Sequence, residues 1–173
     1  MLVIKQLDLT GLRQFADAVV RHGPRQLVIG LVGTLGAGKT TFTQCLAEAA
    51  GVDREDVTSP TFTLMSSYEA KVASGEIRLH HLDAYRLADE DEFLELGVEE
   101  LFDAENTWVL IEWADRVASV MPRQTIWIEL EMAGQDAPDR RTVTMRCDDP
   151  AVLSSLGRIG DDLVIPEDDL PST

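Results

Sequence analysis

An apolar run followed by a glycine-rich loop and a helical segment is the feature that most constrains the fold of this chain. Residues 27–32 (LVIGLV) indicate a buried strand, residues 33–40 (GTLGAGKT) match the pattern G-x-x-x-x-G-K-T, and residues 41–50 indicate a helix. Strand, glycine loop and helix in this order are the context in which that pattern binds phosphate. The segment therefore predicts an α/β fold with a nucleotide site next to the end of a strand.

Each residue type in this loop has a physical role in binding an anion. Glycines let the backbone turn tightly and bring N–H groups against phosphate oxygens, and the following helix points its positive dipole end at the same place. We expect Lys39 to reach the β- and γ-phosphates and the hydroxyl of Thr40 to bind Mg²⁺. The alternative is an ordinary glycine-rich turn with a chance Lys-Thr pair, which the flanking strand and helix argue against.

The composition indicates one acidic domain with a real core. The chain has 173 residues, and its 31 acidic against 15 basic side chains give a net charge of −16. Such a chain repels phosphate backbones at long range, so we expect no direct DNA binding and only indirect contact with RNA, through a partner. No apolar run could span a bilayer and no signal peptide is evident, which predicts a cytoplasmic protein without membrane contact. We expect a single domain over residues 1–147 and an acidic, partly disordered tail over residues 148–173.

The rest of the chain indicates a mixed sheet flanked by helices. Residues 57–68 run from a loop into a strand that pairs with residues 76–83 as an antiparallel hairpin, so the sheet is partly antiparallel. Residues 88–102 indicate one or two short helices broken near Gly97. Their many carboxylates form a solvated face or, alternatively, a docking surface for a basic partner. Further elements are predicted as a helix at 12–20 and strands at 107–112, 125–132 and 141–147.

Two carboxylates follow apolar strands, at the side of the sheet where ligands bind in open α/β folds. Glu112 ends the run 108–111 and resembles a Walker-B acid, so we expect it to bind Mg²⁺ together with Thr40. Asp83 ends the run 77–82 and could orient the attacking water or hold a water on the magnesium. For both residues, a plain carboxylate or cap at a strand end is the alternative.

Sequence alone leaves the roles of nearby polar and aromatic residues open. Thr61 could reach the γ-phosphate as a switch-loop hydroxyl or belong to an ordinary turn, and Trp113 could be packing, a nucleotide contact or a partner contact. His80 and His81 lack a Cys/His cluster at metal spacing, so we do not interpret them as zinc ligands. The guanine-reading pattern N-K-x-D is absent from the sequence, which favours ATP over GTP.

Four blocks of the sequence together resemble the TsaE family, the bacterial ATPases of tRNA threonylcarbamoyladenosine biosynthesis. The blocks are GTLGAGKTT at 33–41, SPTFTL at 59–64, HLDAYRL at 81–87 and IEW at 111–113, in the order and spacing of that family. The resemblance implies a three-layer P-loop α/β sandwich with a partly antiparallel sheet. One departure is Thr34, where the family usually carries an acid.

The resemblance also implies roles for individual residues and for partners. Asp83, Lys39 and Glu112 would be the catalytic residues of a magnesium-dependent ATP hydrolysis, with Thr40 and Glu112 holding the metal. In this family the ATPase acts on two protein partners, TsaD and TsaB, and TsaD transfers the threonylcarbamoyl group to the adenosine beside the anticodon. The residues implied to contact ATP are Gly33, Gly36, Ala37, Gly38, Lys39, Thr40, Thr41, Thr61 and Trp113.

Two other functions fit the same phosphate site. A P-loop kinase for a small metabolite would need a lid with several arginines, and Arg86 and Arg116 are candidates, although no arginine-rich lid segment is visible. A non-catalytic nucleotide-sensing module that controls assembly would need fewer strand-end acids than Asp83 and Glu112 provide. The resemblance therefore favours a weak ATPase that depends on partners.

Overall fold

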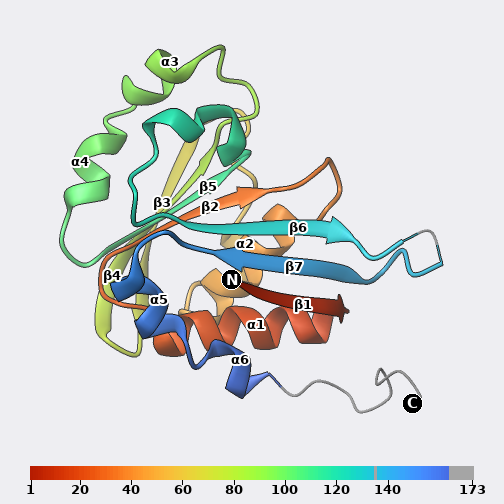
Figure 1. The fold of residues 1–173 in the computed structure, drawn as a ribbon. Helices are drawn as coiled ribbons and strands as arrows, with labels where there is room; N and C mark the ends of the chain where they lie inside the picture. Colours follow the sequence, from red (N-terminus) through yellow and green to blue (C-terminus); the bar gives the residue numbers. More distant parts are fainter. Residues whose placement is uncertain (135, 164–173) are drawn as a thin grey trace, which may run out of the picture.

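A seven-stranded sheet forms the centre of the computed structural model, which describes residues 1–134 and 136–163 (Figure 1). The strand order is β1-β7-β6-β2-β5-β4-β3. The inner strands β6, β2, β5 and β4 run parallel, while β1, β7 and β3 pair antiparallel with their neighbours, which confirms the predicted α/β class with a mixed sheet. The strands are β1 (Leu2–Leu7), β2 (Leu27–Val32), β3 (Met65–Val72), β4 (Gly75–Asp83), β5 (Thr107–Glu112), β6 (Ile126–Met132) and β7 (Arg141–Arg146).

One face of the sheet is covered by the two longest helices of the described chain, α1 (Leu9–His22) and α2 (Lys39–Ala49) (Figure 1). Their apolar sides pack on the sheet through a core that includes Phe15, Phe42 and Trp108, all fully buried. Phe15 and Phe42 also contact each other across the two helices, with ring centroids 5.4 Å apart. Since α2 begins directly after the glycine loop, this packing fixes the position of the loop against the sheet.

The opposite face is covered by a layer of short helices, which gives the fold its third layer (Figure 1). Phe93 and Phe102 anchor this layer in a second core that is separate from the first. Because helices cover both faces, the central strands β2 and β5 are apolar and almost entirely buried. The short helices are α3 (Glu90–Leu94), α4 (Val98–Asp103) and the 3₁₀ segment η2 (Ala114–Val120), and a further 3₁₀ turn, η1 (Arg54–Asp56), follows α2.

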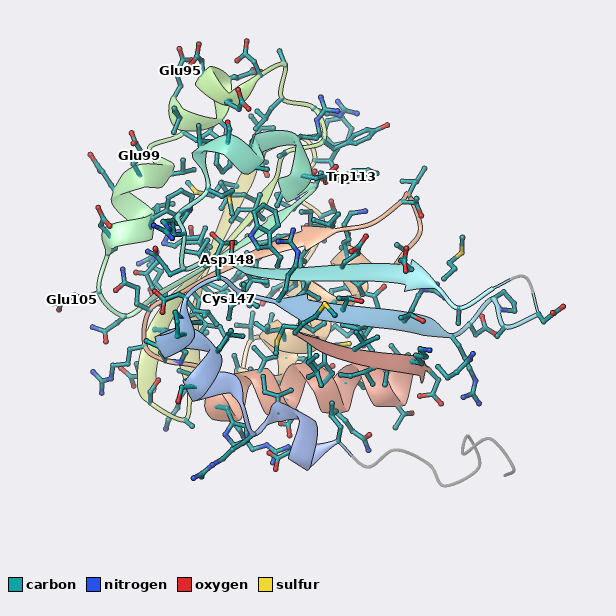
Figure 2. The ribbon with its side chains drawn as sticks, viewed as in Figure 1. Glu95, Glu99, Glu105, Trp113, Cys147 and Asp148 are labelled. Carbon is teal, nitrogen blue, oxygen red and sulfur yellow. The ribbon has the colours of Figure 1, made fainter. Side chains whose placement is uncertain are left out.

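The carboxylates of α3 and α4 lie on the outside of this layer. Glu95 and Glu99 are exposed on its outer side (Figure 2). The two helices meet at Gly97, which adopts φ +74° and starts α4, as the sequence analysis expected for a break at this residue. In the part of the chain that the structure describes, no helix is both long and apolar enough to cross a membrane.

Two short helices, α5 (Pro150–Leu156) and α6 (Ile159–Asp162), follow the sheet where the sequence analysis expected a loose tail. The Asp149 carboxylate caps α5 by accepting hydrogen bonds from two backbone amides of its first turn. Ile159 of α6 is fully buried in the core beneath α1. These helices pack on the same core as the rest of the domain. The remainder of the expected tail, residues 164–173, lies outside the described residues.

Candidate nucleotide site

The loop between β2 and α2 has a backbone path that depends on glycine at two positions. Gly33 has φ +147°, and a Cβ atom there would lie 2.4 Å from the carbonyl oxygen of Leu130. Gly38 has φ +109° and immediately precedes the first turn of α2. Residues with a side chain rarely adopt these angles, so the glycines let the loop fold back over the start of the helix. The free amides of that first turn consequently face the space in front of the loop.

Lys39 lies under this loop rather than extending from it. Its ammonium Nζ donates to the carbonyl oxygens of Gly33 at 2.7 Å and Thr34 at 3.0 Å, and lies 3.6 Å from the ring centroid of Trp113. The side chain is almost wholly buried, and this burial lowers the pKa of Lys39 from its ordinary value. The carboxylates of Glu112, Asp115 and Asp83 oppose the shift, because they favour the charged ammonium.

Glu112 lies at the end of β5, where its two carboxylate oxygens have different partners. Thr40, in the first turn of α2, donates its hydroxyl to Oε2 at 2.8 Å. The ring atom Nε2 of His81, on the neighbouring strand β4, lies 2.8 Å from Oε1. Glu112 is 2% exposed and His81 is fully buried. The strand end thus holds a buried carboxylate whose orientation is fixed from two sides.

Asp83 lies at the end of β4, in register with Glu112 on β5. Its Oδ2 accepts hydrogen bonds from the hydroxyls of Ser59 at 3.1 Å and Thr61 at 2.8 Å. Its Oδ1 accepts one from the backbone amide of Tyr85 at 2.9 Å. The carboxylate is thereby connected to the loop that enters β3, whereas Glu112 is connected to a helix and a strand.

Trp113, directly after Glu112, is one of the residues that line the site. Its backbone has φ +58° and ψ +38°, a left-handed conformation that is uncommon for a bulky residue. This conformation turns the chain sharply from β5 into η2. The indole of Trp113 contacts the ring of Tyr85, with centroids 4.9 Å apart. The Lys39 ammonium lies over the face of the same indole. Trp113 therefore packs against Tyr85 and also lines the site, while a contact with the nucleotide or with a partner stays a prediction.

The groups described above line one pocket of about 360 Å³ at the carboxyl end of the parallel strands. Of the predicted nucleotide residues, Gly33 and Ala37 are not part of the lining. Gly33 contributes its carbonyl to Lys39, and Ala37 is buried within the loop. Leu35, Ser59 and Tyr85 also line the pocket although the sequence analysis gave them no role. The predicted residues that line it are Gly36, Gly38, Lys39, Thr40, Thr41, Thr61, Asp83, Glu112 and Trp113.

The signals for the unassigned residues differ. Ser59 and Tyr85 belong to the blocks SPTFTL and HLDAYRL, so the resemblance could have drawn attention to them. Arg141 on β7 is different, because nothing in the sequence links it to the loop a hundred residues earlier. Its guanidinium Nε donates to the carbonyl of Ala37 at 2.8 Å, and the group also reaches the carbonyl of Gly36. Arg141 therefore stabilises the glycine loop through the carbonyls of Gly36 and Ala37.

The oxygen atoms at the pocket fit a magnesium ion better than a transition metal. Thr40 and Glu112 offer a hydroxyl and a carboxylate, which are hard oxygen ligands. Over the described residues, no group of three or more His, Cys, Asp or Glu side chains could hold a metal by itself. Magnesium in nucleotide sites needs no such cage, since it is bound by one or two protein oxygens together with phosphate oxygens and water.

Comparisons with known proteins agree with this geometry. A family model described as threonylcarbamoyl adenosine biosynthesis protein TsaE matches residues 8–143. A protein of Bacillus subtilis strain 168, named tRNA threonylcarbamoyladenosine biosynthesis protein TsaE, is 41% identical over 109 residues, which cover 63% of this chain and 64% of the relative. A relative of the same name from Haemophilus influenzae is 32% identical over 120 residues, which cover 69% of this chain and 72% of the relative.

A solved structure shares the whole fold. The crystal structure of YdiB from Bacillus subtilis superposes with a TM-score of 0.72 at 26% sequence identity. The superposition covers 92% of this chain and 94% of YdiB. It therefore extends over most of the described elements, beyond the region matched by the sequence comparisons.

Proposed function

Because the chain belongs to the TsaE family of threonylcarbamoyl adenosine biosynthesis proteins, we propose that it is a magnesium-dependent ATPase subunit needed to modify adenosine next to the anticodon of tRNA. In this proposal it acts on a complex of TsaD and TsaB in the cytoplasm and does not transfer the threonylcarbamoyl group itself. One observation carries the proposal: Thr40 is hydrogen-bonded to the buried Glu112 in the pocket that Asp83 also lines. A P-loop that only bound phosphate would have no need of this arrangement.

The loop and its lysine support binding of the phosphate chain. The amides at the start of α2 and the glycine loop provide N–H donors for phosphate oxygens. Lys39 is already in the pocket, bonded to the carbonyls of Gly33 and Thr34. Phosphate oxygens carry more negative charge than these carbonyls, so the ammonium would exchange them for the β- and γ-phosphates. Trp113 would keep the face of its ring against the same ammonium during this exchange.

Thr40 and Glu112 are the residues proposed to hold magnesium. The Thr40 hydroxyl and Glu112 Oε2 are adjacent, so both can face one cation. When bound with the nucleotide, Mg²⁺ would neutralise charge that develops on the β- and γ-phosphate oxygens. Glu112 also contributes negative charge near Lys39, which favours the charged ammonium and opposes the lowering of the Lys39 pKa by burial.

Asp83 is proposed to position the water that attacks the γ-phosphorus. Its Oδ2 accepts from both Ser59 and Thr61, while the Tyr85 amide fixes Oδ1. Thr61 has one hydroxyl proton, so a γ-phosphate that accepted it would release Oδ2 to receive a hydrogen bond from the water. The water would then add to phosphorus as the bond to the β-phosphate oxygen breaks, giving ADP and phosphate. A carboxylate held by several hydrogen bonds orients a nucleophile well, which supports this role.

A second pocket next to the first offers room for the nucleoside part of the nucleotide. It measures about 400 Å³ and shares Gly38 and Thr41 with the first pocket, so a nucleoside attached to phosphates on the loop could enter it. Asp8, Asp139 and Arg141 also line it. These carboxylates do not choose between the bases, since adenine and guanine both carry an exocyclic amine that can donate to them, so the preference for ATP in this proposal rests on the absence of the guanine-reading pattern N-K-x-D from the sequence.

The charge of the chain supports a partner-mediated role. A net charge of −16 disfavours direct tRNA contact, so recognition of the tRNA would fall to the TsaD–TsaB pair. Leu35, which lines the pocket, is 80% exposed, and Phe62, which directly follows the lining residue Thr61, is 83% exposed. Both belong to loops that contact the nucleotide in this proposal, which gives a partner a means to sense the nucleotide.

The proposal is tested by measuring magnesium-dependent ATP hydrolysis with the purified protein, alone and with its cognate TsaD–TsaB pair. We expect slow turnover alone, an increase with the pair, and loss of both in Lys39→Ala. Turnover that the pair leaves unchanged would favour the alternative of a metabolite kinase. Nucleotide binding without any turnover, with or without the pair, would favour a sensing module instead.

A further inference from the structure

His81 is a buried polar residue for which the proposed reaction has so far given no use. It is fully buried on β4, two residues before Asp83, so both side chains project to the same face of the sheet. Its Nε2 lies 2.8 Å from Glu112 Oε1, the oxygen of that carboxylate that Thr40 does not contact. Among the side chains that the structure describes, His81 Nδ1 is the one buried nitrogen or oxygen atom without a hydrogen-bond partner.

This geometry defines the tautomer of the imidazole. A carboxylate oxygen accepts hydrogen bonds, so the atom of His81 that faces Glu112 must carry the proton, and that atom is Nε2. Nδ1 has no hydrogen-bond partner, so the bond from Nε2 is the one hydrogen bond that the structure gives the ring. His81 therefore makes a single side-chain hydrogen bond, and its partner is Glu112.

A core residue that served packing alone would not leave a polar atom unpaired. An aliphatic side chain would fill the same space without the cost of burying an imidazole nitrogen that makes no hydrogen bond. The bond to Glu112 is the one compensation visible for His81 in the structure. The burial of a histidine here is therefore best explained by what it does to Glu112.

We propose that His81 is a positioning residue that occupies Oε1 of Glu112 and turns Oε2 toward Thr40 and the metal. This inference rests on the proposed function, because it assigns Glu112 to magnesium. His81 would not touch the metal or the nucleotide. Its effect is to fix the plane of the carboxylate, so that the metal meets an oxygen already aligned with the Thr40 hydroxyl.

Two amide variants test this role because they differ in which ring nitrogen they replace. In His81→Gln the side-chain NH₂ can occupy the place of Nε2 and donate to Glu112, whereas in His81→Asn the shorter side chain places its NH₂ near the position of Nδ1. Mn²⁺ binding to each protein with ADP is measured by electron paramagnetic resonance, and ADP binding in EDTA is measured by calorimetry. Thermal melting of both variants checks that each is folded.

We expect His81→Gln to keep Mn²⁺ affinity within about threefold of the parent chain, and His81→Asn to lose about 10- to 100-fold, the range typical for partners of metal ligands. ADP binding in EDTA should be alike in all three proteins, since the glycine loop and Lys39 are unchanged. Equal Mn²⁺ affinity in the two variants, or equal loss in both, overturns the positioning role. If the parent chain itself binds no Mn²⁺ with ADP, the proposed function fails as well, and this outcome is distinct from the others.

Discussion

The carboxyl ends of β4 and β5 carry one acid each in the same register, yet the two acids are held in different ways. Glu112 on β5 is bonded by Thr40 of α2 and His81 of β4, both from regular elements packed in the core. Asp83 on β4 is bonded by Ser59 and by a second hydroxyl of the same irregular loop. Both carboxylates are nearly inaccessible, with 2% and 3% exposure, so burial does not distinguish them.

The two carboxylates differ in how easily their hydrogen-bond partners can change position. The partners of Glu112 cannot leave without disturbing a helix or a strand, which suits a ligand that must keep one geometry. The side-chain partners of Asp83 belong to the segment between η1 and β3, where backbone hydrogen bonds are few and one residue, Leu64, has a positive φ of 65°. Such a segment can change its contacts at small cost. We infer that the β5 end is built for fixed metal binding and the β4 end for a contact that depends on the nucleotide.

Glu112→Gln should have the largest effect of the variants considered. Removal of the charge takes away a metal ligand, and stabilisation by a metal is worth several kcal/mol, so turnover should fall by about a thousandfold. ADP binding in EDTA should stay within about threefold, since that binding relies on the glycine loop and Lys39. Glu129→Gln is the matched control, because Glu129 is exposed on β6 and lies outside the pocket. Magnesium-dependent turnover near the parent value would show that Glu112 is not the metal ligand.

Asp83→Asn should lower turnover by about a hundredfold, the range for loss of a group that positions or activates a nucleophile. Unlike Glu112→Gln, it should leave Mn²⁺ affinity with ADP within about threefold, because Asp83 is proposed to act on the water. Asp91→Asn, on the exposed surface of α3, is the control. If Asp83→Asn weakens Mn²⁺ binding as much as Glu112→Gln does, the two strand ends do not have the separate roles proposed for them.

Thr61→Ala should reduce turnover by about tenfold, the lower end for a hydrogen bond to a charged group. Thr61→Ser keeps the hydroxyl and should restore turnover to within about twofold of the parent. Thr63→Ala controls for general changes in the loop, since Thr63 is exposed in the same segment. Equal loss in the serine and alanine variants would mean that the methyl group, and not the hydroxyl, matters at this position.

The sequence predicted the parts of this site that depend on local pattern. The glycine loop, Lys39 and Thr40 lie within one contiguous motif whose strand and helix context is itself local. Asp83 and Glu112 were found because each ends an apolar run, and parallel strands bring their carboxyl ends to one edge. The hairpin β3–β4 and the break at Gly97 were likewise predicted from local pattern and are confirmed.

Contacts between distant segments were not predicted. Arg141 reaches the glycine loop across a sheet order in which β7 is separated from β2 by β6, and single-sequence patterns carry no information on that order. The bond of His81 to Glu112 depends on the register of β4 against β5, which the sequence left open. The helix α5 had a readable signal in Asp149-Pro150, an N-cap followed by proline. The acidic composition of the C-terminal segment favoured a partly disordered tail instead of a helix at this position.

Ser59→Ala should have the smallest effect on turnover of the variants considered. It tests most directly whether the loop that holds Asp83 changes its contacts when nucleotide binds. Ser59 donates to the same Asp83 oxygen as Thr61, over a longer distance of 3.1 Å against 2.8 Å, so alone its loss should reduce turnover by no more than about threefold. If the γ-phosphate draws Thr61 away, Ser59 is the loop hydroxyl left to hold Asp83. Ser59 and Thr61 are also hydrogen-bonded to each other at 2.8 Å, and neighbours coupled in this way usually show non-additive losses. If the two hydroxyls nevertheless act at different stages, the double variant should lose about the product of the single losses. Thr58→Ala, at an exposed neighbouring position, is the control. A double variant no worse than Thr61→Ala would mean that the hydroxyls act as one unit and that the loop does not exchange partners.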